Sequence, residues 1–163
     1  MTHSLLRTDK EIVEIYSRHV RTIYRVCIAY MRNPHDTEDA VHDTFMKMIT
    51  SNTAFESEEH EKAWLIRTAI NVCKNALKHW RRKVESMDKM EDLEYPGGQS
   101  AETSGLFDEI CALPDRYKAV VFLYYYEGYT SAEIAKMLHK PQSTITNHLS
   151  EARKSLRKML GGD

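Results

Sequence analysis

The segment "EGYTSAEIAKMLHKPQSTITNHLSEARKSLRK", residues 127–158, decides the fold class, because two helical patterns meet in it across residues 139–141. The first pattern opens with a capping box, in which the side chains of Thr130 and Glu133 each accept a hydrogen bond from the other residue's backbone amide. Pro141 suits the first position of the second helix, because its fixed φ matches helical geometry. The apolar residues that predict the buried faces are Ile134, Ala135, Leu138, Ile145, Leu149, Ala152 and Leu156.

The opposite face of the second helix is polar near its start and basic further along. A helix-turn-helix unit presents such a face to DNA, with its first turns at base edges in the major groove and later turns near phosphates. Such a corner alone is structural about as often as it binds DNA, and cations near a helix end also suit the negative end of its dipole. The expected exposed side chains, with His148 as a further candidate, are Gln142, Ser143, Thr146, Asn147, Ser150, Arg153, Lys154 and Arg157.

The residues just before this segment predict two more helices of a small domain. Pro114 is expected to end the first, and Asp115 is expected to cap the next, "RYKAVVFLYYYEG". That helix ends near Gly128, which suits the left-handed conformation that often follows a helix. The tyrosines at 124–126 are expected to pack in the core or at an interface. The side chains of the first helix that are expected to face the core are Leu106, Phe107, Ile110 and Leu113.

Charge divides the chain into three parts. Residues 85–109 carry eight acidic and one basic side chain, whereas the segments on either side are mildly basic. The acidic strip also contains Pro96-Gly97-Gly98 and little apolar periodicity, which is typical of a linker. We therefore expect one domain over residues 1–84, a linker over 85–104 and a second domain over 105–163.

The first domain begins with a predicted helix over about 8–32. Thr8 and Glu11 form a second capping box at its start. Asn33-Pro34 is expected to break this helix, because proline lacks the amide that the helix needs.

Two further helices are predicted over about 36–51 and 59–83, with a loop between them and no alternating run that would indicate a strand. Carboxylates in "DTED" suit the positive end of the second helix's dipole. The fold class is therefore expected to be all-α. The residues that recur at helical spacing and are expected inside are Ile12, Tyr16, Ile23, Cys27, Tyr30, Ala40, Val41, Phe45, Met48, Ile49, Ala63, Trp64, Ile66, Ala69, Ile70, Cys73, Leu77 and Trp80.

Composition excludes several classes of protein. The 163 residues are 42% hydrophobic and 29% charged, with a net charge of −1, so a nucleic-acid site must come from local clustering. No apolar run approaches membrane-spanning length, and "MTHSLLRTDKEIVE" lacks the apolar core of a signal peptide, so we expect a cytoplasmic protein without membrane insertion. Cys27, Cys73 and Cys111 are expected to be small core residues. No spacing indicates a metal site, a cofactor or a catalytic motif, so no enzyme is expected.

Three segments together resemble the bacterial RNA polymerase sigma factors of the extracytoplasmic-function (ECF) type, which keep the second and fourth conserved sigma regions joined by a linker. "DTEDAVHDTFMKM" is similar to the segment that docks on core polymerase. "KAWLIRTAINVCKNALKHWRR" is similar to the minus-10 recognition and melting segment. "LPDRYKAVVFLYYYEGYTSAEIAKML" with "STITNHLSEARKSLRKML" is similar to the minus-35 reader. The resemblance covers nearly the whole chain and implies core RNA polymerase, promoter DNA and an anti-sigma factor as partners.

The resemblance also implies roles for individual residues. The docking face is expected to contain Asp39, His42, Asp43 and Met46. The single-stranded minus-10 element is expected to meet the loop "SNTAFESEEH", because an extruded base needs a shaped pocket, and donors on the helix that follows. These minus-10 candidates are Phe55, Lys62, Trp64, Arg67, Asn71, Lys74, Asn75 and Lys78. The minus-35 duplex is expected to meet Gln142, Ser143, Thr146, Asn147, His148, Arg153, Lys154 and Arg157.

The chain departs from the family's usual residues at several positions. Residues 139–140 are His-Lys where the family often has glycine and an aliphatic residue, and residues 146–148 are Thr-Asn-His in place of lysine, serine and arginine. Glu151 stands where the family has a further basic residue. Ile70 stands where it often has an arginine, and Asn75 where it often has an aspartate. These changes lower the expected attraction for phosphates and leave the promoter sequence open. The alternative function is a sigma-like DNA-binding regulator that does not itself start transcription.

Overall fold

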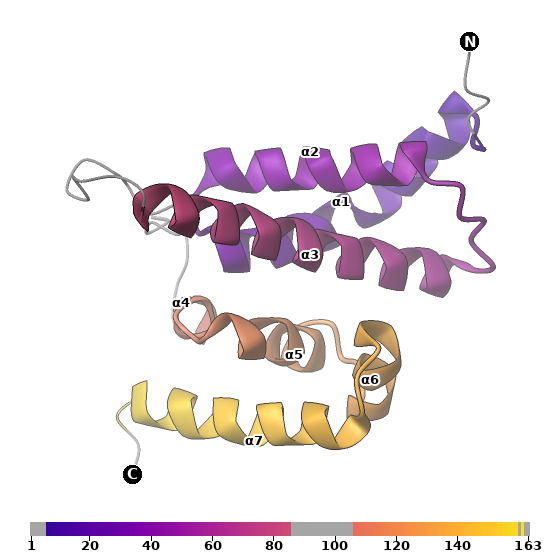
Figure 1. Ribbon diagram of the computed structural model, residues 1–163. Helices are drawn as coiled ribbons and strands as arrows, with labels where there is room; N and C mark the ends of the chain where they lie inside the picture. Colours follow the sequence, from indigo (N-terminus) through magenta and orange to yellow (C-terminus); the bar gives the residue numbers. More distant parts are fainter. Residues whose placement is uncertain (1–5, 86–105, 160, 162–163) are drawn as a thin grey trace. The chain divides into compact units, whose positions relative to one another are not determined.

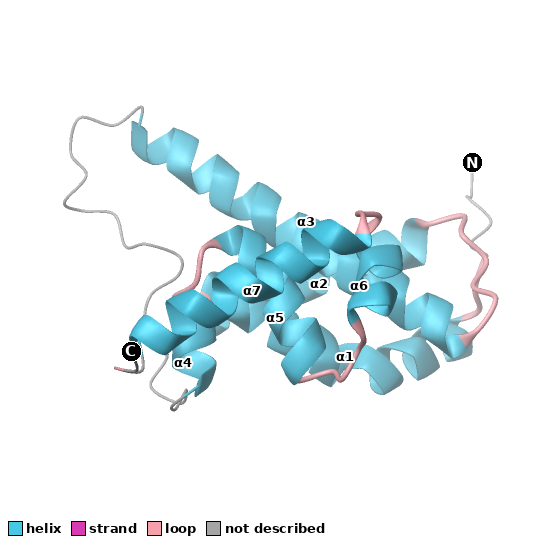
Figure 2. Cartoon of the chain, turned by 90° about the horizontal axis from the view of Figure 1, so that it is seen from below, coloured by secondary structure: helices cyan, strands magenta, loops and turns pink. Residues whose placement is uncertain are grey.

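The structure is a computed structural model that describes residues 6–85, 106–159 and 161. The chain divides into two compact units, one that ends at Gly98 and one that begins at Gln99. Every secondary-structure element in the described ranges is a helix (Figure 2), which confirms the all-α expectation. The expected linker, residues 85–104, lies outside the described residues except for Glu85.

Three long helices form the first unit: α1 (Asp9–Met31), α2 (Pro34–Thr50) and α3 (Glu58–Glu85). Each of the three packs against the other two (Figure 1). Burial of apolar surface between them supplies the main stabilising free energy of the unit. The largest buried side chains of this core include Ile23, Tyr30, Met48, Leu65, Ile66 and Leu77.

The starts of α1 and α2 follow from their capping residues. The capping box before α1 is present, with the Glu11 amide donating to Thr8 Oγ1 over 3.2 Å. The break at Asn33-Pro34 is also present, but α2 begins at Pro34, two residues earlier than expected. Asn33 caps it, since the Asp36 amide donates to Asn33 Oδ1 over 2.9 Å, and proline is well tolerated in a helix's first turn.

Polar contacts also join the helices of the first unit. Glu61 of α3 is buried, and its Oε1 lies 2.7 Å from Nε2 of the buried His19 and accepts a hydrogen bond from Arg18 Nη2 over 3.0 Å. This hydrogen bond raises the pKa of Arg18. We call Arg18, His19 and Glu61 the Glu61 cluster. The sequence did not predict it, because helical spacing does not show which polar side chains meet across two helices.

Tyr16 is a correction to the expected core of the first unit. It is 46% exposed, although its ring packs against Phe45 with the ring centroids 4.8 Å apart. It covers the edge of the core instead of filling its centre. An amphipathic tyrosine is suited to this position, because its ring packs while its hydroxyl stays in water.

Four helices form the second unit: α4 (Leu106–Cys111), α5 (Asp115–Tyr125), α6 (Ser131–Leu138) and α7 (Gln142–Met159). Helices α5 and α7 each pack against the other three helices, so these two form the centre of the unit. The cluster of buried residues between α4, α5 and α7 is Ile110, Leu113, Tyr117, Val121, Ala152 and Leu156.

Details of the second unit differ from the sequence expectations. Asp115 is the first residue of α5 and does not cap it, because Pro114 occupies the capping position without a side-chain hydrogen bond. Pro141 likewise precedes α7 and accepts from the Ile145 amide over 3.3 Å. Tyr125 and Tyr126 are 47% and 43% exposed, so they are not core residues.

The turn between α6 and α7 has a left-handed residue at its centre. The capping box at Thr130 and Glu133 opens α6 as predicted. The helix ends on His139, whose φ of 56° and ψ of 47° lie in the region that glycine occupies without strain. The next amide, of Lys140, donates to the Ala135 carbonyl over 2.9 Å and closes the helix end. Gly128 also has a positive φ, 75°, which agrees with the left-handed conformation expected there.

The three cysteines are buried and unbridged, which confirms them as core residues. Within the described ranges, no helix combines the length and the apolar character that crossing a bilayer requires.

Candidate nucleic-acid and partner interfaces

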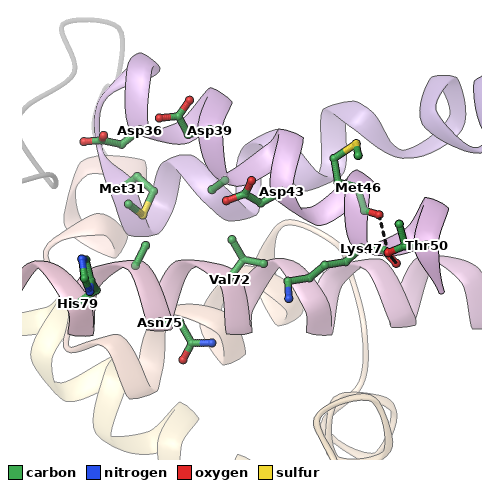
Figure 3. Close-up of a pocket in the computed structure, with 12 residues that line it drawn as sticks. Met31, Asp36, Asp39, Asp43, Met46, Lys47, Thr50, Val72, Asn75 and His79 are labelled. Atoms are coloured by element: carbon green, nitrogen blue, oxygen red, sulfur yellow. Dashed lines mark hydrogen bonds between the residues drawn. The ribbon is translucent and has the colours of Figure 1, made fainter.

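A groove of about 670 Å³ runs between α2 and α3 (Figure 3). We call it the α2–α3 groove. Asp39, Asp43 and Met46, three of the four expected docking residues, line it from α2. His42, the fourth, is exposed on α2 but does not line the groove. The remaining lining residues are Met31, Asp36, Ala40, Lys47, Thr50, Val72, Asn75, Ala76 and His79.

The groove combines an acidic rim with an apolar floor. Asp39 and Asp43 are exposed, and Figure 3 shows them on the α2 side, across from Asn75 and His79 on α3. Met31, Ala40 and Val72 of the lining are buried apolar residues. A partner that fits there needs basic groups around an apolar contact, since like charges across an interface are unfavourable.

The α3 wall changes the interpretation of Asn75. It was grouped with the minus-10 candidates, but the structure places it in the α2–α3 groove. His79, which is not among the residues predicted from the sequence, lies four residues further along the same face and also lines the groove. Their spacing places Asn75 and His79 on the same face of α3. Only the packing of α3 against α2 brings this face into the groove with Asp43.

One group of metal-ligand residue types lies at the start of α2. Donor atoms of His35, Asp36 and Asp39 all lie within 4.8 Å of one another. Asp36 accepts a hydrogen bond from Asn33 Nδ2 over 2.7 Å, so it takes part in the cap of the helix. Asp36 also lies in the first turn of α2, where a carboxylate interacts favourably with the helix dipole.

The loop between α2 and α3, residues 51–57, gathers an aromatic cluster. The Phe55 ring packs edge-on against His60 and Trp64, with centroid distances of 5.6 Å and 5.5 Å. The Arg7 guanidinium carbon lies 4.5 Å from the Phe55 centroid on top of the ring. We call these four residues the Phe55 cluster. Phe55 and Trp64 were expected minus-10 candidates; Arg7 and His60 were not selected, because nothing in their sequence spacing links them to Phe55.

The remaining minus-10 candidates lie along α3. Trp64, Arg67, Asn71, Lys74 and Lys78 recur at intervals of three or four residues, so they share one face of the helix. Trp64 and Arg67 are half-buried, and the other three are exposed. Lys62 is also half-buried near the start of the helix. Arg67, Asn71, Lys74 and Lys78 therefore continue the face that begins at Trp64 of the Phe55 cluster, whereas Lys62, two residues before Trp64, lies on a different face of α3.

The expected minus-35 face of α7 is exposed along its length. Ser143, Thr146, Ser150, Lys154 and Arg157 recur every three or four residues on the face opposite the core, and Asn147 lies beside them. We call these six residues the α7 stripe. All six are exposed, whereas Ile145, Leu149, Ala152 and Leu156 are buried.

The other expected minus-35 residues have partners within the unit. Gln142 Nε2 donates to Ser131 Oγ over 3.2 Å, which joins the starts of α7 and α6. Arg153 Nε donates to the Tyr125 hydroxyl over 2.9 Å, and this bond raises the pKa of Arg153. His148 is half-buried and packs edge-on against the buried Tyr117, with ring centroids 5.5 Å apart. These three side chains therefore flank the stripe.

Comparison with protein families identifies both units. The family model for Sigma-70 region 2 matches residues 15–83, and that for Sigma-70, region 4 matches residues 106–156. The chain is 26% identical over 156 residues to RNA polymerase sigma factor SigV of Bacillus subtilis, covering 92% of this chain and 91% of SigV. It is also 26% identical over 171 residues to ECF RNA polymerase sigma factor SigW of the same organism, and this match covers 92% of this chain and 87% of SigW.

A solved structure shares the fold. The sigma factor RpoE of Bartonella quintana, in a complex with the anti-sigma factor NepR, superimposes with a TM-score of 0.75 at 20% identity. The match covers 94% of this chain and 99% of the RpoE chain. These three findings lead to the same family: the two regions match in order, the relatives match over most of their length, and the fold is shared. The chain belongs to the sigma-70 family as an ECF-type sigma factor with regions 2 and 4, a non-enzymatic protein that directs promoter recognition by RNA polymerase.

Proposed function

We propose that the two units divide promoter recognition between them. Residues 1–84 dock on core polymerase and hold the opened minus-10 strand, residues 105–163 read the minus-35 duplex, and residues 85–104 link them. The observation that carries this proposal is the α7 stripe, six exposed polar and basic side chains on the face opposite the core of a helix-turn-helix unit.

The order of residues along the stripe supports separate tasks. Side chains in the first turns of a recognition helix reach deepest into the major groove, and Ser143, Thr146 and Asn147 occupy those turns. The Asn147 amide both donates and accepts, so it can form a bidentate pair with an adenine edge. Lys154 and Arg157 follow on the same face and would contact phosphates. Gln142, His148 and Arg153 would assist from the flanks of the stripe.

Docking on core polymerase is assigned to the α2–α3 groove and the adjoining surface of α2. The exposed Asp39, His42, Asp43 and Met46 combine negative charge with an apolar contact, which suits a basic and partly apolar partner surface. Because Asn75 and His79 form the opposite wall of the groove, we include them in this surface. Asn75 is therefore assigned to polymerase docking and no longer to DNA.

Capture of the opened strand is assigned to loop 51–57 and α3. Aromatic rings stack on unpaired bases of any sequence, and the Phe55 cluster provides half-buried rings at the start of the α3 donor face. Lys62, Arg67, Asn71, Lys74 and Lys78 would hold the backbone of the strand. An extruded base would enter the loop, since a regular helix offers no pocket of that shape.

We also infer a cytoplasmic location and an anti-sigma partner. The location follows from the work of a polymerase subunit, and the partner is suggested by the RpoE chain, whose structure is a complex with NepR. An anti-sigma factor that covers the α2–α3 groove or the α7 stripe would block the assigned tasks.

Run-off transcription with reconstituted holoenzyme tests the proposed function. Promoters would first be selected from genomic DNA with core polymerase and this chain, then transcribed in its presence and absence. Transcripts that start at the selected promoters only when the chain is present are expected. Holoenzyme that binds these promoters without producing transcripts would favour an accessory DNA-binding regulator.

A further inference from the structure

Arg7 is a buried cation that lies just before the first helix. Its residue is only 6% exposed, and its guanidinium donates hydrogen bonds to three backbone carbonyls, those of Met48, Ser51 and Thr53. The first two distances are 3.0 Å and 3.4 Å. These carbonyls lie 41 to 46 residues away in the sequence, at the end of α2 and in loop 51–57. One side chain therefore ties the start of the chain to the loop.

These bonds matter because the loop has no regular backbone pairing of its own. The last carbonyls of a helix lack partners within that helix, and a cation near this end also interacts favourably with the dipole. A planar guanidinium can bond several carbonyls at once, which a lysine ammonium cannot do with the same geometry. On the other side of the loop, the Glu56 amide donates to His60 Nδ1 over 3.1 Å. Arg7 thus fixes the α2 side of the loop and His60 the α3 side.

The same guanidinium also orients the ring of the Phe55 cluster. Its carbon lies 4.5 Å from the Phe55 centroid, within the range of a cation–π contact. Trp64 contacts the same ring, so Phe55 is held between Arg7 and α3. Arg7 consequently controls both the backbone of the loop and the direction of its aromatic side chain.

We propose that Arg7 is a positioning residue for capture of the unpaired promoter base by loop 51–57. Its bonds to Met48, Ser51 and Thr53 shape the loop before DNA arrives, and its contact with Phe55 fixes the ring on which the base stacks. This inference rests on the proposed role of the loop. It assigns part of promoter melting to a residue that precedes the first helix and lies outside the family match at residues 15–83.

The test measures binding of holoenzyme to the labelled nontemplate strand of a promoter obtained in the selection experiment. Arg7→Ala should weaken binding of this strand about tenfold, while association with core polymerase and with the upstream duplex stays unchanged. Arg7→Lys should keep the fold and show a smaller loss, because it retains the charge without the three-carbonyl geometry. Arg18→Ala is the control, since Arg18 joins α1 to α3 through Glu61 but does not touch the loop.

Phe55→Ala separates failure of this inference from failure of the proposed function. If Phe55→Ala leaves strand binding unchanged, the loop is not the capture site and the proposed role of the loop fails. If Phe55→Ala weakens binding but both Arg7 variants bind normally, Arg7 is not a positioning residue. An equal loss in Arg7→Ala and Arg18→Ala would mean general destabilisation and would also overturn the inference. Less than additive losses in the Arg7→Ala, Phe55→Ala double variant would support it.

Discussion

The two units hold their helices together with different kinds of polar contact. In the first unit, charged side chains at helix contacts are buried: Glu61 beside His19, and Arg7 among backbone carbonyls. In the second unit, the bonds from Arg153 to Tyr125 and from Gln142 to Ser131 join helices at exposed positions. A buried charge that loses its partner is costly, whereas an exposed hydrogen bond is readily replaced by water. Removing Glu61 should therefore destabilise the first unit more than breaking either of these exposed bonds destabilises the second.

The largest effect is expected from Glu61→Ala. The substitution leaves His19 buried and Arg18 without this carboxylate, so the first unit should lose about 3 kcal/mol of unfolding free energy. Thermal unfolding should show a lower melting temperature for this unit and an unchanged one for the second. Glu58→Ala is the matched control, because the Glu58 side chain is 74% exposed and 3.8 Å from Arg18; it should change stability by less than about 0.5 kcal/mol. Equal losses in both variants would contradict the buried-charge interpretation.

A large effect without unfolding is expected at the α2–α3 groove. Replacing both Asp39 and Asp43 with arginine should weaken association with core polymerase more than about a hundredfold, because two guanidinium groups would repel the basic partner surface that the two carboxylates attract. Circular dichroism should show unchanged helical content. Glu38→Arg offers a control on the same helix, since Glu38 is exposed but does not line the groove. Normal binding by the double variant would place the docking surface elsewhere.

Along the α7 stripe, the effect should depend on position. Asn147→Ala should change preference at one or two upstream base pairs by about 1–3 kcal/mol, because a bidentate amide pair is lost. Arg157→Ala should instead weaken all promoters alike and reduce the salt dependence of binding. Both can be measured with a library of minus-35 sequences at several salt concentrations. If both variants weakened binding to all promoters equally, α7 would not lie in the major groove of the DNA in the orientation proposed here.

The smallest effect is expected at His139, where the second unit contains backbone strain. Glycine adopts the observed left-handed φ without steric cost, so His139→Gly should stabilise this unit by about 1 kcal/mol. Lys140→Gly, one residue later and with no positive φ, should not stabilise it. Urea denaturation monitored in each unit would show the difference. No gain from His139→Gly would mean that contacts of the histidine side chain offset the strain.

The sequence predicted sites on single helices better than sites shared between helices. The exposed and buried faces of α7 follow from spacing along one helix, and all six residues of the α7 stripe are exposed as expected. The α2–α3 groove depends on how two helices pack, so spacing along α3 alone did not place Asn75 in the groove and did not indicate His79. Arg7 and Glu61 were missed for the same reason, because their partners lie more than 40 residues away.

The composition of the α2–α3 groove determines how binding of its partner depends on the kind of salt in solution. Rim carboxylates act through a field that salt screens, with a Debye length of about 10 Å at 0.1 M, whereas contacts with the apolar floor are not weakened in this way. Sulfate even strengthens apolar association, because it is excluded from protein surfaces. A partner in this groove should therefore be released by sodium chloride only in part, and ammonium sulfate at the same ionic strength should retain more of the complex.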